Sequence, residues 1–124
     1  MDGAELRATA LAGLRRLEGY ARTFPMARPR ARLCRGAWQE LEGRRRPALR
    51  SWARALVAAE RLAMPWELAW ARHELGRRLG PGERASGGLD GPALLERAAA
   101  GFEAMGCRPA DPTRARAEGR PARR

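Results

Sequence analysis

The chain has 124 residues, with 25 Lys and Arg against 14 Asp and Glu, and a formal net charge of +11. This length provides one domain with one hydrophobic core and excludes a second, enzymatic domain beside it. All the basic residues are Arg, while Lys, Ile and Asn are absent. That bias is typical of GC-rich codons, so the charge is weak evidence for an anionic partner.

The sequence pattern also excludes membrane-spanning proteins and proteins with a secretory signal. No apolar run approaches the roughly 18 residues that span a bilayer. The first residues lack the basic and apolar regions of a secretory signal. Two cysteines, Cys34 and Cys107, are too few for a disulfide framework. We therefore predict a cytoplasmic protein that makes no membrane contact.

Apolar residues recur every three or four positions along most of the chain, which predicts amphipathic helices. The five predicted helices span residues 2–19, 29–42, 47–63, 66–79 and 92–106. Their apolar stripes include Leu6, Ala10, Leu14 and Leu17 in the first helix; Leu49, Trp52, Leu56 and Ala59 in the third; Leu68, Ala71, Leu75 and Leu79 in the fourth; and Leu95, Ala98, Phe102 and Met105 in the fifth.

Proline and glycine mark the ends of these helices. A proline in the first turn loses an N–H that would have no helical partner, and a glycine after the last turn can adopt positive φ. Prolines stand at the predicted starts (Pro29, Pro47, Pro65 and Pro92) and glycines at the predicted ends (Gly19, Gly43, Gly80 and Gly106). The sequence therefore predicts an all-α fold.

Two segments fall outside the helical pattern. Residues 80–91 are rich in glycine and predict a mobile loop. Residues 108–124 consist largely of Arg, Pro and Ala without an apolar stripe, and we predict a disordered tail there. The predicted domain organisation is one helical domain over residues 1–107, containing loop 80–91, followed by the tail.

The spacing of residue sizes suggests paired helices. Ala48, Trp52 and Ala55 follow Gly36 at offsets of 12, 16 and 19. A small residue on one helix admits the ring of the next, so that the two helices approach closely. The order of sizes recurs in Gly76, Ala98, Phe102 and Met105, if about ten extra residues are allowed in the loop.

This spacing resembles the tetratricopeptide repeat (TPR), an antiparallel helix pair of about 34 residues. The resemblance implies antiparallel pairs stacked as a short right-handed solenoid. It departs from the repeat at Arg32 and Arg72, which stand where a large aromatic is usual, and at Met105, which replaces the last alanine.

A narrower resemblance covers about residues 14–110 and is carried by residues 20–43, 50–80 and 94–110. They are similar to the C-terminal helical-repeat regions of bacterial proteins that join an adenylate or guanylate cyclase domain to an AAA-type ATPase domain, and of LuxR-type regulators. The resemblance implies a regulatory, partner-sensing module of a signalling system without catalytic residues. It also implies an ATPase or nucleotide cyclase domain as partner.

The sequence contains no recognisable catalytic or metal-binding motif. His73 is the only imidazole, and no Cys or second His stands three or four residues away to complete a metal site. Neither cysteine has a histidine base in its motif. We therefore predict no catalytic residue, no metal and no cofactor.

In a TPR-like stack the first helix of each pair lines the concave face. Carried over from the repeat, the predicted partner-binding groove consists of Arg30, Leu33, Ala37, Glu40, Trp70, His73 and Arg77. Trp70, His73 and Arg77 share one helix face, because they stand at i, i+3 and i+7. A tryptophan beside cationic side chains is typical of an interface hot spot. The alternative is that Trp70 packs on the first helix or on a neighbouring repeat unit outside this chain.

Two functions compete. The first is a non-enzymatic protein–protein interaction module that binds a peptide or a partner helix. The alternative is a basic helical protein that binds nucleic acid through its arginines, with a steep salt dependence. That surface would comprise Arg15, Arg16, Arg44, Arg45, Arg46, Arg77, Arg78 and the tail. Uncapped apolar faces at the ends of a short stack also suggest a homo-oligomer.

Overall fold

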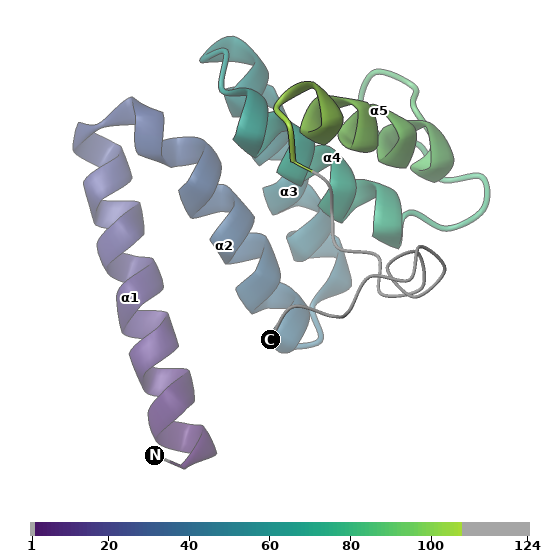
Figure 1. Cartoon of the computed structure of the whole chain (residues 1–124). Helices are drawn as coiled ribbons and strands as arrows, with labels where there is room; N and C mark the ends of the chain where they lie inside the picture. Colours follow the sequence, from purple (N-terminus) through teal and green to yellow (C-terminus); the bar gives the residue numbers. More distant parts are fainter. Residues whose placement is uncertain (1, 108–124) are drawn as a thin grey trace, which may run out of the picture.

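The computed structural model describes residues 2–107 and shows an all-α fold (Figure 1). Within these residues lie five α-helices and one 3-10 turn, η1. Their bounds are α1 Gly3–Thr23, η1 Pro25–Ala27, α2 Arg28–Leu41, α3 Arg45–Arg61, α4 Pro65–Arg78 and α5 Gly91–Ala104. The predicted all-α class and the number of helices are confirmed, while the predicted tail, 108–124, lies outside the described residues.

Each helix packs mainly on its neighbour in the chain, so that the helices follow one another from α1 at one end to α5 at the other (Figure 1). The closest associations are α2 with α3 and α4 with α5. Helices therefore pack in pairs, as predicted. Within residues 2–107, no helix is both long and apolar enough to cross a membrane.

The first helix ends later than predicted. Gly19 does not terminate it, and α1 continues to Thr23. It stops at Phe24, which adopts an extended backbone (φ −115°, ψ 98°) directly before Pro25. Proline disfavours the helical conformation in the residue that precedes it, which explains the new end. The turn glycines Gly43 and Gly106 do have positive φ, as predicted.

Trp52 occupies the centre of the α2–α3 pair. Its side chain is 1% exposed, and its indole Nε1–H donates to the carbonyl of Leu33 at 3.2 Å. A Cβ placed on Gly36 would lie 2.7 Å from two ring carbons of Trp52, so only glycine fits there. Ala48 and Ala55 are also buried. The predicted contact between Gly36 and Trp52 is confirmed.

The predicted second set of contacts is wrong in part. Gly76 lies against the start of α5, where a Cβ would come within 2.9 Å of Leu95 and 3.0 Å of the Gly91 carbonyl. Phe102 instead packs edge to face on Trp66, with ring centroids 5.1 Å apart. Because the start of α5 meets the end of α4, Phe102 reaches the opposite end of the pair. Ala98 is fully buried, as predicted.

The segment predicted as a mobile loop has its own hydrogen bonds. The Ala85 N–H donates to the Leu89 carbonyl at 2.8 Å, and Arg84 and Asp90 form an isolated antiparallel bridge. Ala85 and Leu89 pack against the core. Asp90 then caps α5 by accepting from the Ala93 N–H at 3.0 Å. This loop fixes where α5 begins.

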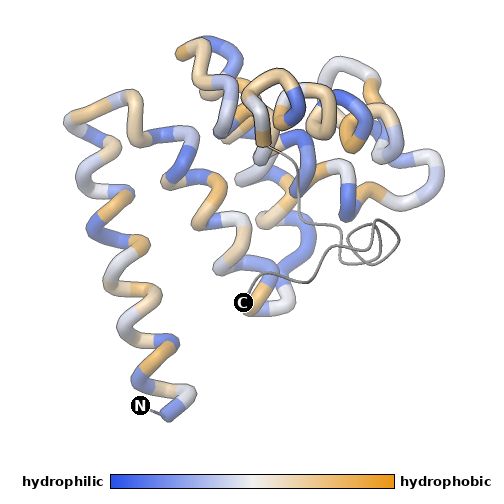
Figure 2. Tube along the Cα trace, viewed as in Figure 1, coloured by the Kyte–Doolittle hydropathy of each residue, from blue (hydrophilic) through white to orange (hydrophobic). Residues whose placement is uncertain are grey.

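The first helix is held less firmly than the others. Of its residues only Leu14 and Ala21 are buried, and Leu6, which was predicted on the same stripe, is 57% exposed. Figure 2 shows hydrophobic and hydrophilic stretches alternating along α1. A large part of its apolar surface therefore remains uncovered by the described residues.

Substitution of Gly36 tests the contact with Trp52. Gly36→Ala should lower the free energy of unfolding by about 1–3 kcal/mol, because the new methyl overpacks the indole. The matched control is Gly19→Ala, since Gly19 lies inside α1 with nothing within 4 Å of its Cβ position. That control should stabilise the chain by about 0.5–1 kcal/mol. Urea unfolding followed by circular dichroism measures both, and equal effects would contradict the packing.

Candidate functional site

A cleft of about 450 Å³ lies between α1, α2 and α3. Five of its residues are arginines and only one is a carboxylate. The lining residues are Glu18, Ala21 and Arg22 from α1; Arg28, Ala31, Arg32 and Arg35 from α2; and Ser51 and Arg54 from α3. We call this feature the arginine cleft.

Helical spacing explains why the arginines converge. Arg28, Arg32 and Arg35 stand at i, i+4 and i+7 on α2 and therefore share one face. Two small buried residues, Ala21 and Ala31, come from the facing helices. Because these positions carry only methyl groups, the space between the helices is left to the long guanidinium side chains.

Three of these arginines are positioned by hydrogen bonds within the cleft. Arg35 Nε donates to Glu18 Oε2 at 2.9 Å, and its Nη2 binds the other oxygen, so the pair is bidentate. The hydrogen bond with Glu18 raises the pKa of Arg35. Arg28 donates to the Ala21 carbonyl at 3.3 Å, and Arg32 donates to the Arg54 carbonyl at 3.4 Å.

Most of the positive charge in the cleft lacks a counter-charge from residues 2–107. Within residues 2–107, only Arg35 among the cleft arginines forms an ion pair with a carboxylate. Burial lowers the pKa of Arg32, and the charges of Arg28, Arg54 and Arg61 lower it further. A concave site lined by one sign of charge concentrates the opposite ion. The arrangement therefore favours an anionic ligand.

Two of the predicted groove residues belong to the core or pack against it. Leu33 does not face a ligand: it is 1% exposed, and its carbonyl accepts from Trp52. Leu33 lies one turn before Gly36 and so points into the α2–α3 core, which corrects its assignment. Trp70 is half-buried and packs against the core of α2, α3, α4 and α5.

Ion pairs cross the seam between α2 and α4, where the groove was predicted. Arg30 lies 3.8 Å from Glu67, and Glu40 is paired with Arg78. The remaining predicted residues are Ala37 and Arg77, which are exposed, and His73, which is half-buried. Because charged pairs occupy this seam, the arginine cleft is the more open of the two surfaces.

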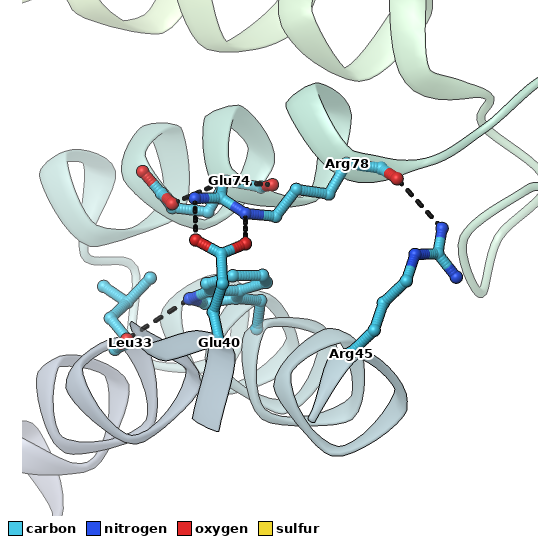
Figure 3. A network of polar contacts seen from close by, with 6 residues as sticks. Leu33, Glu40, Arg45, Glu74 and Arg78 are labelled. Atoms are coloured by element: carbon cyan, nitrogen blue, oxygen red, sulfur yellow. Dashed lines mark hydrogen bonds and ion pairs between the residues drawn. The ribbon is translucent and has the colours of Figure 1, made fainter. Parts of the chain in front are cut away.

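A smaller cavity of about 270 Å³ has a structural role. It is lined by Glu40, Gly43, Arg45, Ala48, Leu49, Trp52 and Arg78. The Arg78 guanidinium lies 4.3 Å from the Trp52 ring centroid and binds both Glu40 and Glu74 (Figure 3). The hydrogen bond from Arg78 lowers the pKa of Glu40. These charges are already satisfied by one another, so the cavity favours no ligand.

The described residues offer little for covalent or metal chemistry. Burial raises the pKa of the Cys34 thiol, which keeps it protonated and a poor nucleophile. No group of three His, Cys, Asp or Glu side chains within residues 2–107 is arranged to hold a metal. The arrangement in the arginine cleft is suited to binding an anion.

Sequence analysis missed the arginine cleft. Within residues 2–107, none of the arginines predicted to bind nucleic acid lines the cleft, and Arg32 was predicted only as a departure from the repeat. The i, i+4, i+7 row of Arg28, Arg32 and Arg35 was the available signal. Such a row is unusual on the helix face that meets the preceding helix.

Removing one cleft charge tests this electrostatic description. Arg32→Gln should raise the free energy of unfolding by about 0.5 kcal/mol at low ionic strength, because repulsion from Arg28 and Arg54 is relieved. The gain should shrink in high salt, which screens the charges. Thermal unfolding at two salt concentrations measures this, with the exposed Arg50→Gln as control. A loss of stability in Arg32→Gln would contradict the description.

No model of a known protein family, no curated protein and no solved structure matches this chain. The resemblance to the tetratricopeptide repeat therefore stays a prediction. The contact that suggested it, Trp52 on Gly36, is present in the structure.

Proposed function

We propose that the chain is a non-enzymatic protein–protein interaction module that binds an acidic segment of a partner protein in the arginine cleft. The observation that supports this most is the composition of the cleft walls, five arginines with one carboxylate. The resemblance to repeat regions of bacterial signalling proteins supports a regulatory, partner-sensing role for this binding.

The size of the cleft fits a short peptide segment. Ligand pockets are usually about 300–1,000 Å³, and the arginine cleft measures about 450 Å³. This volume suits a few side chains of a partner rather than a folded surface. Guanidinium groups bind carboxylates through two parallel hydrogen bonds, which gives both strength and orientation. Arg35 already binds Glu18 in this way.

Nucleic acid is the less favoured ligand. Proteins that bind single strands usually stack bases on aromatic side chains along a basic groove. None of the residues that line the arginine cleft is aromatic, and its arginines converge on one hollow. A peptide with two or three neighbouring carboxylates matches this arrangement better than an extended phosphate backbone.

Binding of a labelled acidic peptide tests the proposal. Fluorescence anisotropy with fluorescein-labelled hexaglutamate, at about 150 mM salt, should show saturable binding to the full chain. The double variant Arg32→Gln/Arg54→Gln should weaken it at least tenfold, because each charged hydrogen bond contributes about 1.5–3 kcal/mol.

The matched control removes the same charge elsewhere. Arg50→Gln/Arg97→Gln replaces two exposed arginines outside the cleft and should leave the affinity within about twofold. Equal losses in both double variants would show that the peptide binds by net charge alone. Tighter binding of a single-stranded oligonucleotide, with affinity falling steeply as salt rises, would replace the proposal with the nucleic-acid alternative.

A further inference from the structure

A second apolar stripe on α1 is left largely uncovered by residues 2–107. Leu6, Ala10, Gly13, Leu17, Tyr20 and Phe24 recur every three or four residues. At about 100° per residue, the five that belong to α1 lie within about 40° of one line along the helix. Phe24, which directly follows α1, stacks on Tyr20. Leu6 is 57% exposed, Tyr20 54% and Phe24 46%.

This stripe differs from the face that packs on α2. Leu14 and Ala21, the two buried residues of α1, lie about 60–80° further round the helix. Glu18, which lines the arginine cleft, lies further in the same direction. The exposed stripe therefore contributes little to the packing of α1 on α2, and none of its residues lines the arginine cleft. It carries two stacked aromatic rings, Tyr20 and Phe24, with centroids 4.5 Å apart.

The order of residue sizes along the stripe is self-complementary. If two copies of α1 run antiparallel, residues whose numbers sum to 30 lie opposite one another. Tyr20 then faces Ala10, and Leu17 faces Gly13, whose Cβ position has nothing within 4 Å. Leu6 faces Phe24 at both ends. Each bulky central side chain meets a small one, which permits close approach of the two helices.

The helix dipoles favour the same orientation. Antiparallel pairing places the positive end of one α1 dipole beside the negative end of the other, whereas parallel pairing would bring like ends together.

We propose that a second copy of this chain docks on the exposed stripe, forming a two-fold symmetric dimer with antiparallel α1 helices. Such an interface uses the same patch on both copies, so assembly closes at two chains. The paired helices bury Leu6, Tyr20 and Phe24 of each copy, and the arginine cleft of each copy stays open.

Sedimentation velocity of the full chain over a range of concentrations tests the dimer. We expect a monomer–dimer equilibrium, and Tyr20→Glu should weaken dimerisation at least tenfold because a carboxylate enters the apolar seam. The matched control, Ala8→Glu, adds the same charge at an exposed position on the opposite side of α1 and should leave the equilibrium unchanged. Circular dichroism should show equal helicity in both variants.

Cross-linking tests the orientation. In a chain that also carries Cys34→Ser and Cys107→Ser, Gly13→Cys and Leu17→Cys are prepared separately and then mixed. Antiparallel pairing predicts that a short bis-maleimide links the two different variants most efficiently, whereas parallel pairing would link each variant to itself.

Three results would overturn the dimer: a monomer at all concentrations, equal effects of Tyr20→Glu and Ala8→Glu, or preferential linking of identical variants. A monomer would leave the stripe for another occupant, such as a partner helix. Because Tyr20 lies outside the arginine cleft, hexaglutamate binding reports on the proposed function separately.

Discussion

The arrangement of the central helices depends on the packing of the Trp52 indole. One side of the ring lies on Gly36, its Nε1–H donates to Leu33, and the Arg78 guanidinium covers it. Trp52 thereby joins α3 to both α2 and α4. Arg78 completes the link by pairing with Glu40 on α2. These three helices are consequently fixed as one unit, which positions the α2 and α3 walls of the arginine cleft.

The third wall of the cleft, α1, is attached more weakly than α2 and α3. The cleft also lowers the stability of the fold, because its arginines repel one another. Leu14, Ala21 and the Glu18–Arg35 pair hold α1 to the rest of the chain. These contacts are opposed by repulsion among the other cleft arginines, because none of them pairs with a carboxylate within residues 2–107. A binding site commonly sacrifices some stability in this way, and an anionic ligand restores it because binding to the folded state alone stabilises that state.

The sequence predicted what depends on short-range spacing. The five helices and the contact of Gly36 with Trp52 follow from helical periodicity within one tightly connected pair. The register of α5 on α4 did not, because the Asp90 cap and the loop before it determine where α5 starts. The cleft was missed for a related reason. The first helix, α1, has two apolar stripes, and either of them is suited to packing on α2. The sequence alone does not show that the side with Leu14 packs there instead of the side with Tyr20.

The two proposed surfaces of α1 have a joint consequence. They lie on different sides of the helix, so a dimer through the exposed stripe would carry two arginine clefts related by the two-fold axis. A partner with two acidic segments could then occupy both, and the second binding event would be intramolecular. Such a partner would be bound more tightly by the dimer than by the monomer. By linkage, that partner would also promote dimerisation, because the free-energy coupling between two binding events is reciprocal.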